Sequence, residues 1–125
     1  MNLLLDTHAI LWWLTGDPRL RPAARASITK EAGHVVVSAA SAWEMSIKAA
    51  TGKLDPPSEW LGVALASGFE PLSITFEHAV EAGGLPRHHA DPFDRMLVAQ
   101  ARLEDLVIVT ADPRIARYDV RTLAA

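Results

Sequence analysis

Four acidic residues stand where their carboxylates could act together on a charged ligand. Asp6 follows the apolar stretch LLL, Glu44 lies near the start of a predicted helix, Asp94 follows HADPF, and Asp112 comes shortly after LVIVT. Carboxylate oxygens are the ligands that hard divalent cations such as Mg²⁺ and Mn²⁺ prefer. A cation of this kind can activate water and stabilise the leaving oxygen of a phosphodiester. These residue types therefore indicate metal-assisted hydrolysis, provided that the fold brings them together.

Helix capping explains each of these acids separately. In HADPFDRMLVAQA, residues 89–101, Asp91 is a good N-cap, Pro92 suits the first helical position, and Asp94 favours the positive end of the helix dipole. The other acids could act as caps through the pairs Asp6-Thr7, Ser41-x-x-Glu44 and Asp112-Pro113. Both interpretations stay open for any one acid taken alone.

The elements that would position the acids alternate between strands and helices. Apolar stretches predict strands at 2–5, 34–38, 69–74, 106–110 and 119–123, with Pro71 weakening the third. Helices are expected at 7–14, 22–31, 41–50, 58–66, 76–82, 92–104 and 113–117. LLL, VVV and LVIV are continuously apolar, which is typical of parallel strands covered on both faces. Right-handed crossovers then predict a three-layer α/β/α domain spanning residues 1–125.

A parallel sheet would gather the four acids at one edge. The carboxyl ends of its strands meet there, and ligands usually bind at that edge. Asp94 joins the group because a crossover helix runs antiparallel to its strand. Two like charges about 4 Å apart cost roughly 4 kcal/mol at an effective dielectric near 20. No lysine or arginine is the immediate neighbour of Asp6, Glu44 or Asp112, and Arg95 adjoins only Asp94. A divalent cation would relieve this repulsion.

Composition restricts the other classes of protein. A length of 125 residues suits one domain, and the absence of cysteine excludes disulfides and thiolate metal sites. The start of the chain has no basic region, and Asp6 splits its apolar run, which argues against a signal peptide or membrane span. We therefore expect a cytoplasmic protein. A net charge of −3 provides no bulk attraction to nucleic acid. Two groups of arginines are expected to be mostly solvated surface charge, although a few of them could face phosphate: Arg19, Arg21 and Arg25, and Arg114, Arg117 and Arg121.

Four segments resemble the PIN-domain ribonucleases, and most closely the VapC-type toxins of bacterial and archaeal toxin–antitoxin pairs. They are LLDTHAILWW, SAASAWEMSIKAATGKL, HADPFDRMLVAQA and VTAD, and the resemblance covers Met1 to about Asp119. It implies a parallel sheet ordered 3-2-1-4-5. It also implies that Asp6, Glu44, Asp94 and Asp112 are catalytic and surround one or two Mg²⁺ or Mn²⁺ ions. The activity implied is cleavage of single-stranded RNA by metal-activated water, leaving a 5′-phosphate and a 3′-hydroxyl.

The resemblance further implies partners. Toxins of this kind form homodimers and are blocked by an antitoxin peptide that covers a hydrophobic groove near the active site. Candidate groove residues are Leu11, Trp12, Trp13 and Met45, although burial in the core is the alternative for these side chains.

Several polar residues lie close in sequence to the predicted site. The hydroxyls of Thr7, Ser41 and Thr110 could bond a carboxylate or a metal-bound water, or could satisfy nearby backbone groups. Asp91 is expected to cap its helix and to reach the site through water. The histidines have no HxxxH or HxH spacing, so we expect His8, His88 and His89 to be surface or loop residues.

Two other classes of protein compete with a nuclease. A haloacid-dehalogenase-like phosphatase also begins with an apolar strand and an aspartate, but it needs a second aspartate where this chain has His8. A non-catalytic binding module could keep the PIN fold as a protein-interaction scaffold. Such a scaffold has no reason to retain four like charges at one edge, which favours the nuclease.

Overall fold

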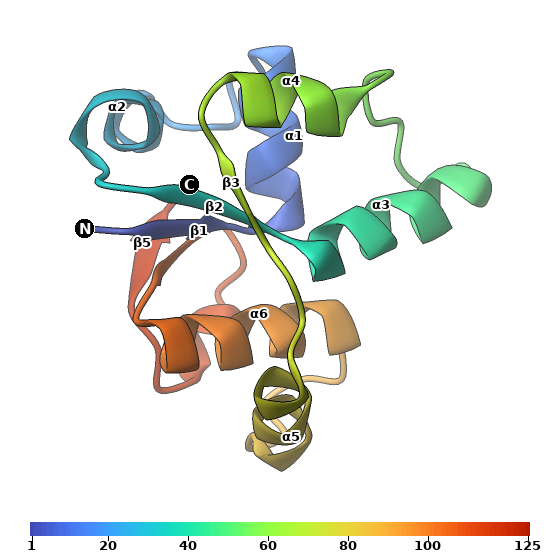
Figure 1. The fold of residues 1–125 in the computed structure, drawn as a ribbon, viewed down its shortest axis with the longest axis vertical. Coiled ribbons are helices and arrows are strands. Elements are labelled where there is room, and N and C mark those ends of the chain that lie inside the picture. Colours follow the sequence, from blue (N-terminus) through green and yellow to red (C-terminus); the bar gives the residue numbers. More distant parts are fainter.

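The computed structural model describes residues 1–125, in which five strands alternate with helices (Figure 1). The strands are β1 (Leu3–Leu5), β2 (Val35–Ser38), β3 (Glu70–Leu72), β4 (Val107–Thr110) and β5 (Thr122–Ala124). The α-helices are α1 (Thr7–Thr15), α2 (Pro22–Ala26), α3 (Ala39–Ala50), α4 (Trp60–Ala66), α5 (Phe76–Gly84) and α6 (Pro92–Glu104). A π-helical segment, Ser27–Glu31, extends α2, and a 3₁₀ turn, Ile115–Arg117, follows β4.

The five strands form one sheet in the order β3-β2-β1-β4-β5, and every neighbouring pair is parallel. This confirms the predicted sheet and its 3-2-1-4-5 order. Strand β1 lies at the centre, where Leu4 pairs with Val36 on one side and with Ile108 on the other. Pro71 is tolerated because β3 is an edge strand, on which a missing backbone N–H leaves no neighbour unpaired.

Two hydrophobic clusters separate the sheet from its helical layers. Leu3, Leu5, Val35 and Val37 pack with α1, α2 and α4 on one face. The alternate strand residues, including Leu4 and Ile108, pack with α6 and Tyr118 on the other face. Figure 1 shows the resulting arrangement, with α1, α2 and α4 above the sheet and α5 and α6 below it. The three-layer prediction is therefore confirmed, because side chains on both faces of each central strand are buried.

The start of α3 differs from the prediction. The helix begins at Ala39, and the Ser38 hydroxyl caps it by accepting a hydrogen bond from the Ala40 N–H at 3.0 Å. Ser41 lies inside the helix, so the predicted capping box Ser41-x-x-Glu44 is wrong. The helix begins two residues earlier than expected because Ser38, at the end of β2, is itself a good N-cap. Glu44 consequently stands in the second turn of α3.

The segment after β4 is also shorter than predicted. Only Ile115–Arg117 forms a helical turn, whereas residues 113–117 were expected to be helical. Helix α6 has the predicted bounds, Pro92–Glu104. None of the helices combines the length and apolar character that crossing a bilayer requires.

Candidate functional site

Asp6 occupies the junction between β1 and α1. Its Oδ1 accepts a hydrogen bond from the Ala9 N–H at 2.8 Å, so Asp6 is the N-cap of α1. The side chain is buried and faces a cavity at the carboxyl edge of the sheet. Burial raises the pKa of Asp6 above its ordinary value, while hydrogen bonds from Thr110 and the Ala9 N–H oppose that rise. Asp6 thus acts as a cap and also presents a carboxylate to the cavity.

Glu44 reaches the same cavity from α3. It accepts a hydrogen bond from the Thr7 hydroxyl at 2.5 Å, and its other oxygen pairs with Lys48, one helical turn further on. The Ser41 hydroxyl lies 3.1 Å from that of Thr7, so Ser41 contacts the site only through Thr7. The side chain of Glu44 is only 4% exposed. Its pairing with Lys48 departs from the expectation that Glu44 has no neutralising neighbour.

Asp94 and Asp91 stand at the start of α6. Asp91 Oδ1 accepts hydrogen bonds from the N–H groups of Phe93 and Asp94, at 2.9 and 3.0 Å, which makes it the predicted N-cap. Asp94 projects from the first turn into the cavity. Arg95 does not neutralise it, because the guanidinium bonds to backbone carbonyls elsewhere.

The ionised form of Asp94 is strongly disfavoured in the metal-free site, as its pKa shows. Burial, followed by the charges of Asp91, Asp6, Glu44 and Asp112, raises this pKa from 3.8 to about 7. No lysine or arginine contacts the Asp94 carboxylate. Nearby positive charge would restore its ionised form at neutral pH.

Asp112 lies two residues beyond the end of β4. Its carboxylate accepts hydrogen bonds from the backbone N–H and guanidinium of Arg114, which lower the pKa of Asp112 below its ordinary value. The Thr110 hydroxyl accepts a hydrogen bond from the Asp112 N–H at 3.0 Å and also bonds to Asp6. Thr110 therefore ties together the two strand ends that carry these aspartates.

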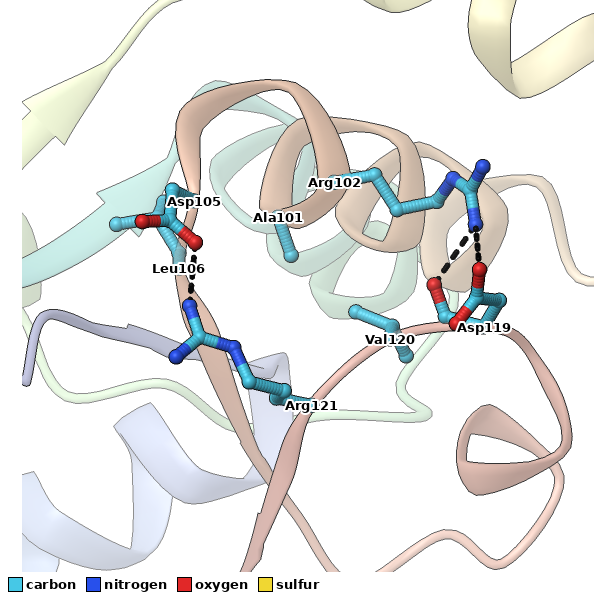
Figure 2. A pocket seen from close by; sticks show the side chains of 7 residues that line it. All are labelled: Ala101, Arg102, Asp105, Leu106, Asp119, Val120 and Arg121. Atoms are coloured by element: carbon cyan, nitrogen blue, oxygen red, sulfur yellow. Dashed lines mark hydrogen bonds and ion pairs between the residues drawn. The ribbon is translucent and has the colours of Figure 1, made fainter.

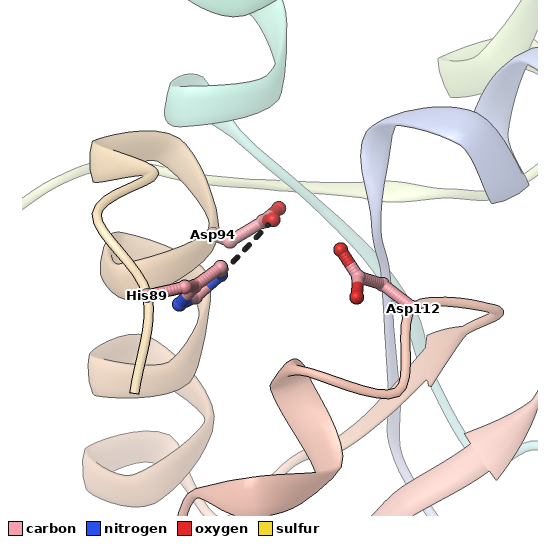
Figure 3. A group of neighbouring side chains, drawn as sticks. All are labelled: His89, Asp94 and Asp112. Carbon is pink, nitrogen blue, oxygen red and sulfur yellow. Dashed lines mark hydrogen bonds and ion pairs between the residues drawn. The ribbon is translucent and has the colours of Figure 1, made fainter. Parts of the chain in front are cut away.

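His89 lies in a loop, as expected, but it is not a surface residue, because its side chain reaches the site. Its side chain is only 5% exposed, and Nε2 lies 3.4 Å from Asp94 Oδ2. Donor atoms of His89, Asp94 and Asp112 all lie within 4.8 Å of one another (Figure 3). Asp6 and Glu44 line the same cavity but are not part of this close group. His89 precedes α6 in a loop, where no helical or strand spacing signals its direction.

The cavity holds about 150 Å³, and no apolar residue lines it. Five carboxylates face two cationic side chains across it, which leaves an excess of negative charge. The lining residues are Asp6, Thr7, His8, Glu44, Lys48, Asp91, Asp94, Asp112 and Arg114. Hard oxygen donors with uncompensated charge fit the divalent cation that the family resemblance implies. Lys48 and Arg114 reduce the repulsion that the bare sequence suggested, but they leave Asp6 and Asp94 without a cation.

A larger hollow of about 390 Å³ lies near the opposite edge of the sheet, where α6 ends and β4 and β5 begin (Figure 2). Its charged side chains are already paired. Arg102 contacts Asp119, and Arg121 donates to Asp105 at 2.5 Å. Because these charged side chains already have partners, they have little capacity to bind a ligand. The acidic cavity is therefore the better candidate site.

Comparisons with known proteins agree with this fold. The model of the PIN domain family matches residues 3–121. Among solved structures, VapBC2 from Rickettsia felis, bound to a DNA fragment from its promoter, is 14% identical with a TM-score of 0.72, over 98% of both chains. A toxin-antitoxin complex from Klebsiella pneumoniae is 18% identical with a TM-score of 0.69, over 98% of this chain and 96% of that one. DNA-bound VapBC from Salmonella typhimurium is 19% identical with a TM-score of 0.66, over 98% and 97%.

These structural similarities concern the fold alone, because the sequence identities are low. No curated protein sequence matches the chain. The family model, by contrast, spans nearly the whole sequence, from the first residue of β1 to the residue before β5. The chain therefore belongs to the PIN domain family.

Proposed function

We propose that this protein is a divalent-metal-dependent endoribonuclease that cleaves single-stranded RNA and serves as the toxin of a toxin–antitoxin pair. The observation that carries the proposal is the surplus of buried carboxylate charge at the carboxyl edge of the sheet, centred on Asp94. An RNA phosphodiester is itself an anion, so this cavity would repel the substrate unless a cation were present. Cellular RNA as the substrate would place the protein in the cytoplasm.

Asp6, Glu44, Asp94 and Asp112 are the residues that would hold Mg²⁺ or Mn²⁺, as one or two ions. When bound, such a cation supplies Lewis-acid chemistry, by which water becomes a nucleophile and the leaving oxygen of the phosphodiester is stabilised.

The chain's own residues keep these carboxylates in place. Thr7 donates to Glu44 and Thr110 bonds to Asp6, so each of these buried carboxylates has one hydroxyl that fixes its rotation. Hydrogen bonds from the backbone and the Arg114 guanidinium hold Asp112. Carboxylates held in this way require little reorganisation when a cation binds, which favours tight binding.

Arg114 is also suited to bind the substrate. Its side chain is about half exposed at the rim of the cavity, and only part of its five-donor guanidinium is used by Asp112. A planar guanidinium can donate two parallel hydrogen bonds to a phosphate. We therefore assign Arg114 to the RNA phosphate next to the scissile bond.

Exposed apolar side chains support the proposal that the chain binds protein partners. Trp43 is 61% exposed on α3, close to the site, and Phe76 is 90% exposed on α5. Such residues are more often found in protein interfaces than in open solvent. Of the candidate groove residues, Leu11, Trp12 and Trp13 are partly buried, but Met45 is fully buried and cannot line a groove. We propose that an antitoxin covers the α1–α3 side and that a second copy of the chain forms a homodimer.

The alternative function is a non-catalytic PIN-fold scaffold. The two functions are separated by incubating the purified protein with single-stranded RNA in Mg²⁺, in Mn²⁺ and in EDTA, with Asp6→Asn as a parallel variant. The nuclease predicts cleavage that EDTA abolishes and added metal restores, and a loss of orders of magnitude in the variant. Equal RNA degradation by wild type and variant would indicate a contaminating enzyme, and intact RNA under all conditions would favour the scaffold.

A further inference from the structure

Arg95 adjoins Asp94 in sequence but is bound to the end of α5. Its guanidinium donates to the carbonyl oxygens of Ala82, Leu85 and Pro86 at 2.9–3.1 Å. These three bonds fix the position of the guanidinium against the end of α5. One of its nitrogens, Nη1, also lies 3.2 Å from the Tyr118 hydroxyl oxygen.

The Tyr118 hydroxyl links Arg95 to His89. It is buried below the loop that precedes α6, and its oxygen lies 2.8 Å from His89 Nδ1. A guanidinium can only donate hydrogen bonds, so the Tyr118 oxygen accepts from Arg95. The hydroxyl proton is then free to be donated to His89 Nδ1. Arg95 and His89 are the only hydrogen-bond partners of this buried hydroxyl, and Arg95 cannot accept, so Nδ1 is the one available acceptor for the hydroxyl proton.

The bond to Nδ1 determines which nitrogen of His89 carries the proton. When Nδ1 accepts a hydrogen bond, the neutral ring is protonated at Nε2. Nε2 faces Asp94 Oδ2 at 3.4 Å, so its N–H points at that carboxylate (Figure 3). A protonated ring nitrogen has no lone pair for a metal. His89 is therefore oriented as a donor to Asp94 and not as a ligand beside it.

We propose that Arg95, Tyr118 and His89 form a hydrogen-bonded chain that positions the Asp94 carboxylate for metal binding. Glu44 is held by Thr7 and Lys48, and Asp112 by Arg114, whereas His89 is the only side chain that bonds to Asp94. His89 is thus a positioning residue, and Tyr118 and Arg95 act through it. This inference rests on the proposed function, in which Asp94 holds the cation.

Tyr118→Phe tests the chain with little change in packing. The phenyl ring keeps its contacts with the rings of His88 and His89 and loses only the hydroxyl. Removing a partner that orients a metal ligand typically lowers metal affinity or activity by about 10–100-fold. We expect Mn²⁺ affinity, measured by titration followed by EPR, to fall about 10-fold, and kcat for RNA cleavage to fall more than KM changes. Melting in EDTA checks that the variant is folded.

His88→Gln is the matched control, because His88 is exposed and its ring touches Tyr118 without facing Asp94. It should keep the Mn²⁺ affinity of the wild type. His89→Gln places an amide donor near the position of Nε2, so it should retain most of the affinity that His89→Ala loses.

Pulsed EPR of bound Mn²⁺ distinguishes a positioning histidine from a ligand. A coordinated imidazole produces a ¹⁴N hyperfine coupling, and the inference predicts that wild type shows none. A ¹⁴N coupling that disappears in His89→Ala, or an unchanged Mn²⁺ affinity in Tyr118→Phe, would overturn the inference and leave the proposed function standing. Failure of the wild type to bind Mn²⁺ would overturn both.

Discussion

Replacing Asp94 with asparagine should stabilise the metal-free protein, because a carboxylate that serves as a metal ligand is repelled by its neighbours when the cation is absent. Because the folded-state pKa of Asp94 is raised from 3.8 to about 7, the folded protein holds this proton more tightly than the unfolded chain does. Ionisation of Asp94 therefore does not lower the free energy of unfolding below about pH 4, and it lowers that free energy by an increasing amount as the pH rises to about 7. At about 1.4 kcal/mol per pKa unit, the full cost is at most about 4 kcal/mol.

The net effect of Asp94→Asn is smaller than this limit. The Asp94 side chain is 16% exposed, so water screens part of the repulsion. We therefore expect ionised Asp94 to lower the free energy of unfolding by about 2–4 kcal/mol. Asparagine is neutral at every pH, but it gives up about 0.3–1 kcal/mol of helix-dipole stabilisation. The variant should thus be about 1–3 kcal/mol more stable than wild type near pH 8. For a chain of this length, that corresponds to a rise in Tm of roughly 4–12 °C.

Thermal melting in EDTA at about pH 5 and pH 8 measures this effect. The stability gap between variant and wild type should shrink by more than half at the lower pH, where wild-type Asp94 is protonated in the folded state. Mn²⁺ at about 100 times its Kd should then stabilise wild type by about 2.7 kcal/mol and the variant by far less. A variant that melts below wild type at pH 8 in EDTA, or a gap that does not change with pH, would show that Asp94 serves the helix and not the cavity.

Three further substitutions test separate parts of the account. Lys48→Met should lower the free energy of unfolding of the metal-free protein by about 3 kcal/mol, because it leaves the buried Glu44 carboxylate without its cation. Thermal melting measures this, and an effect no larger than that of the exposed control Lys53→Met would contradict it. Asp91→Asn should keep Tm, Mn²⁺ response and RNA cleavage near wild type, because asparagine caps a helix nearly as well as aspartate; loss of the Mn²⁺ response would make Asp91 a ligand. Light scattering at micromolar concentration should give the mass of a dimer, which Phe76→Glu shifts toward the monomer; a wild-type monomer would disprove the homodimer.

The fold was predictable because its central strands are apolar on both faces. LLL, VVV and LVIV have no polar alternation, so only a parallel sheet with helices on each side can bury them. Element boundaries were less certain where two residues could cap the same helix. Ser38 and Ser41 both precede an apolar run, and only packing in the folded chain selects Ser38.

The carboxylates of the candidate site were predictable from their places at strand ends and helix starts. Their partners were harder to foresee. The spacing of Glu44 and Lys48, one helical turn apart, is a local signal that could have revealed their pairing. His89 offers no such signal, because a loop turns it back toward Asp94 and a residue 29 positions later, Tyr118, holds it there. Contacts between distant loop segments depend on the whole fold.

The central claim is that the acidic cavity binds the cation that RNA cleavage requires. The most direct test measures Mn²⁺ occupancy by EPR and the initial rate of single-stranded RNA cleavage in one titration of the purified protein. Occupancy and rate should rise together with the same midpoint, and Asp6→Asn should suppress both. Full cleavage in EDTA, or a cavity saturated with Mn²⁺ that leaves the RNA intact, would contradict the claim.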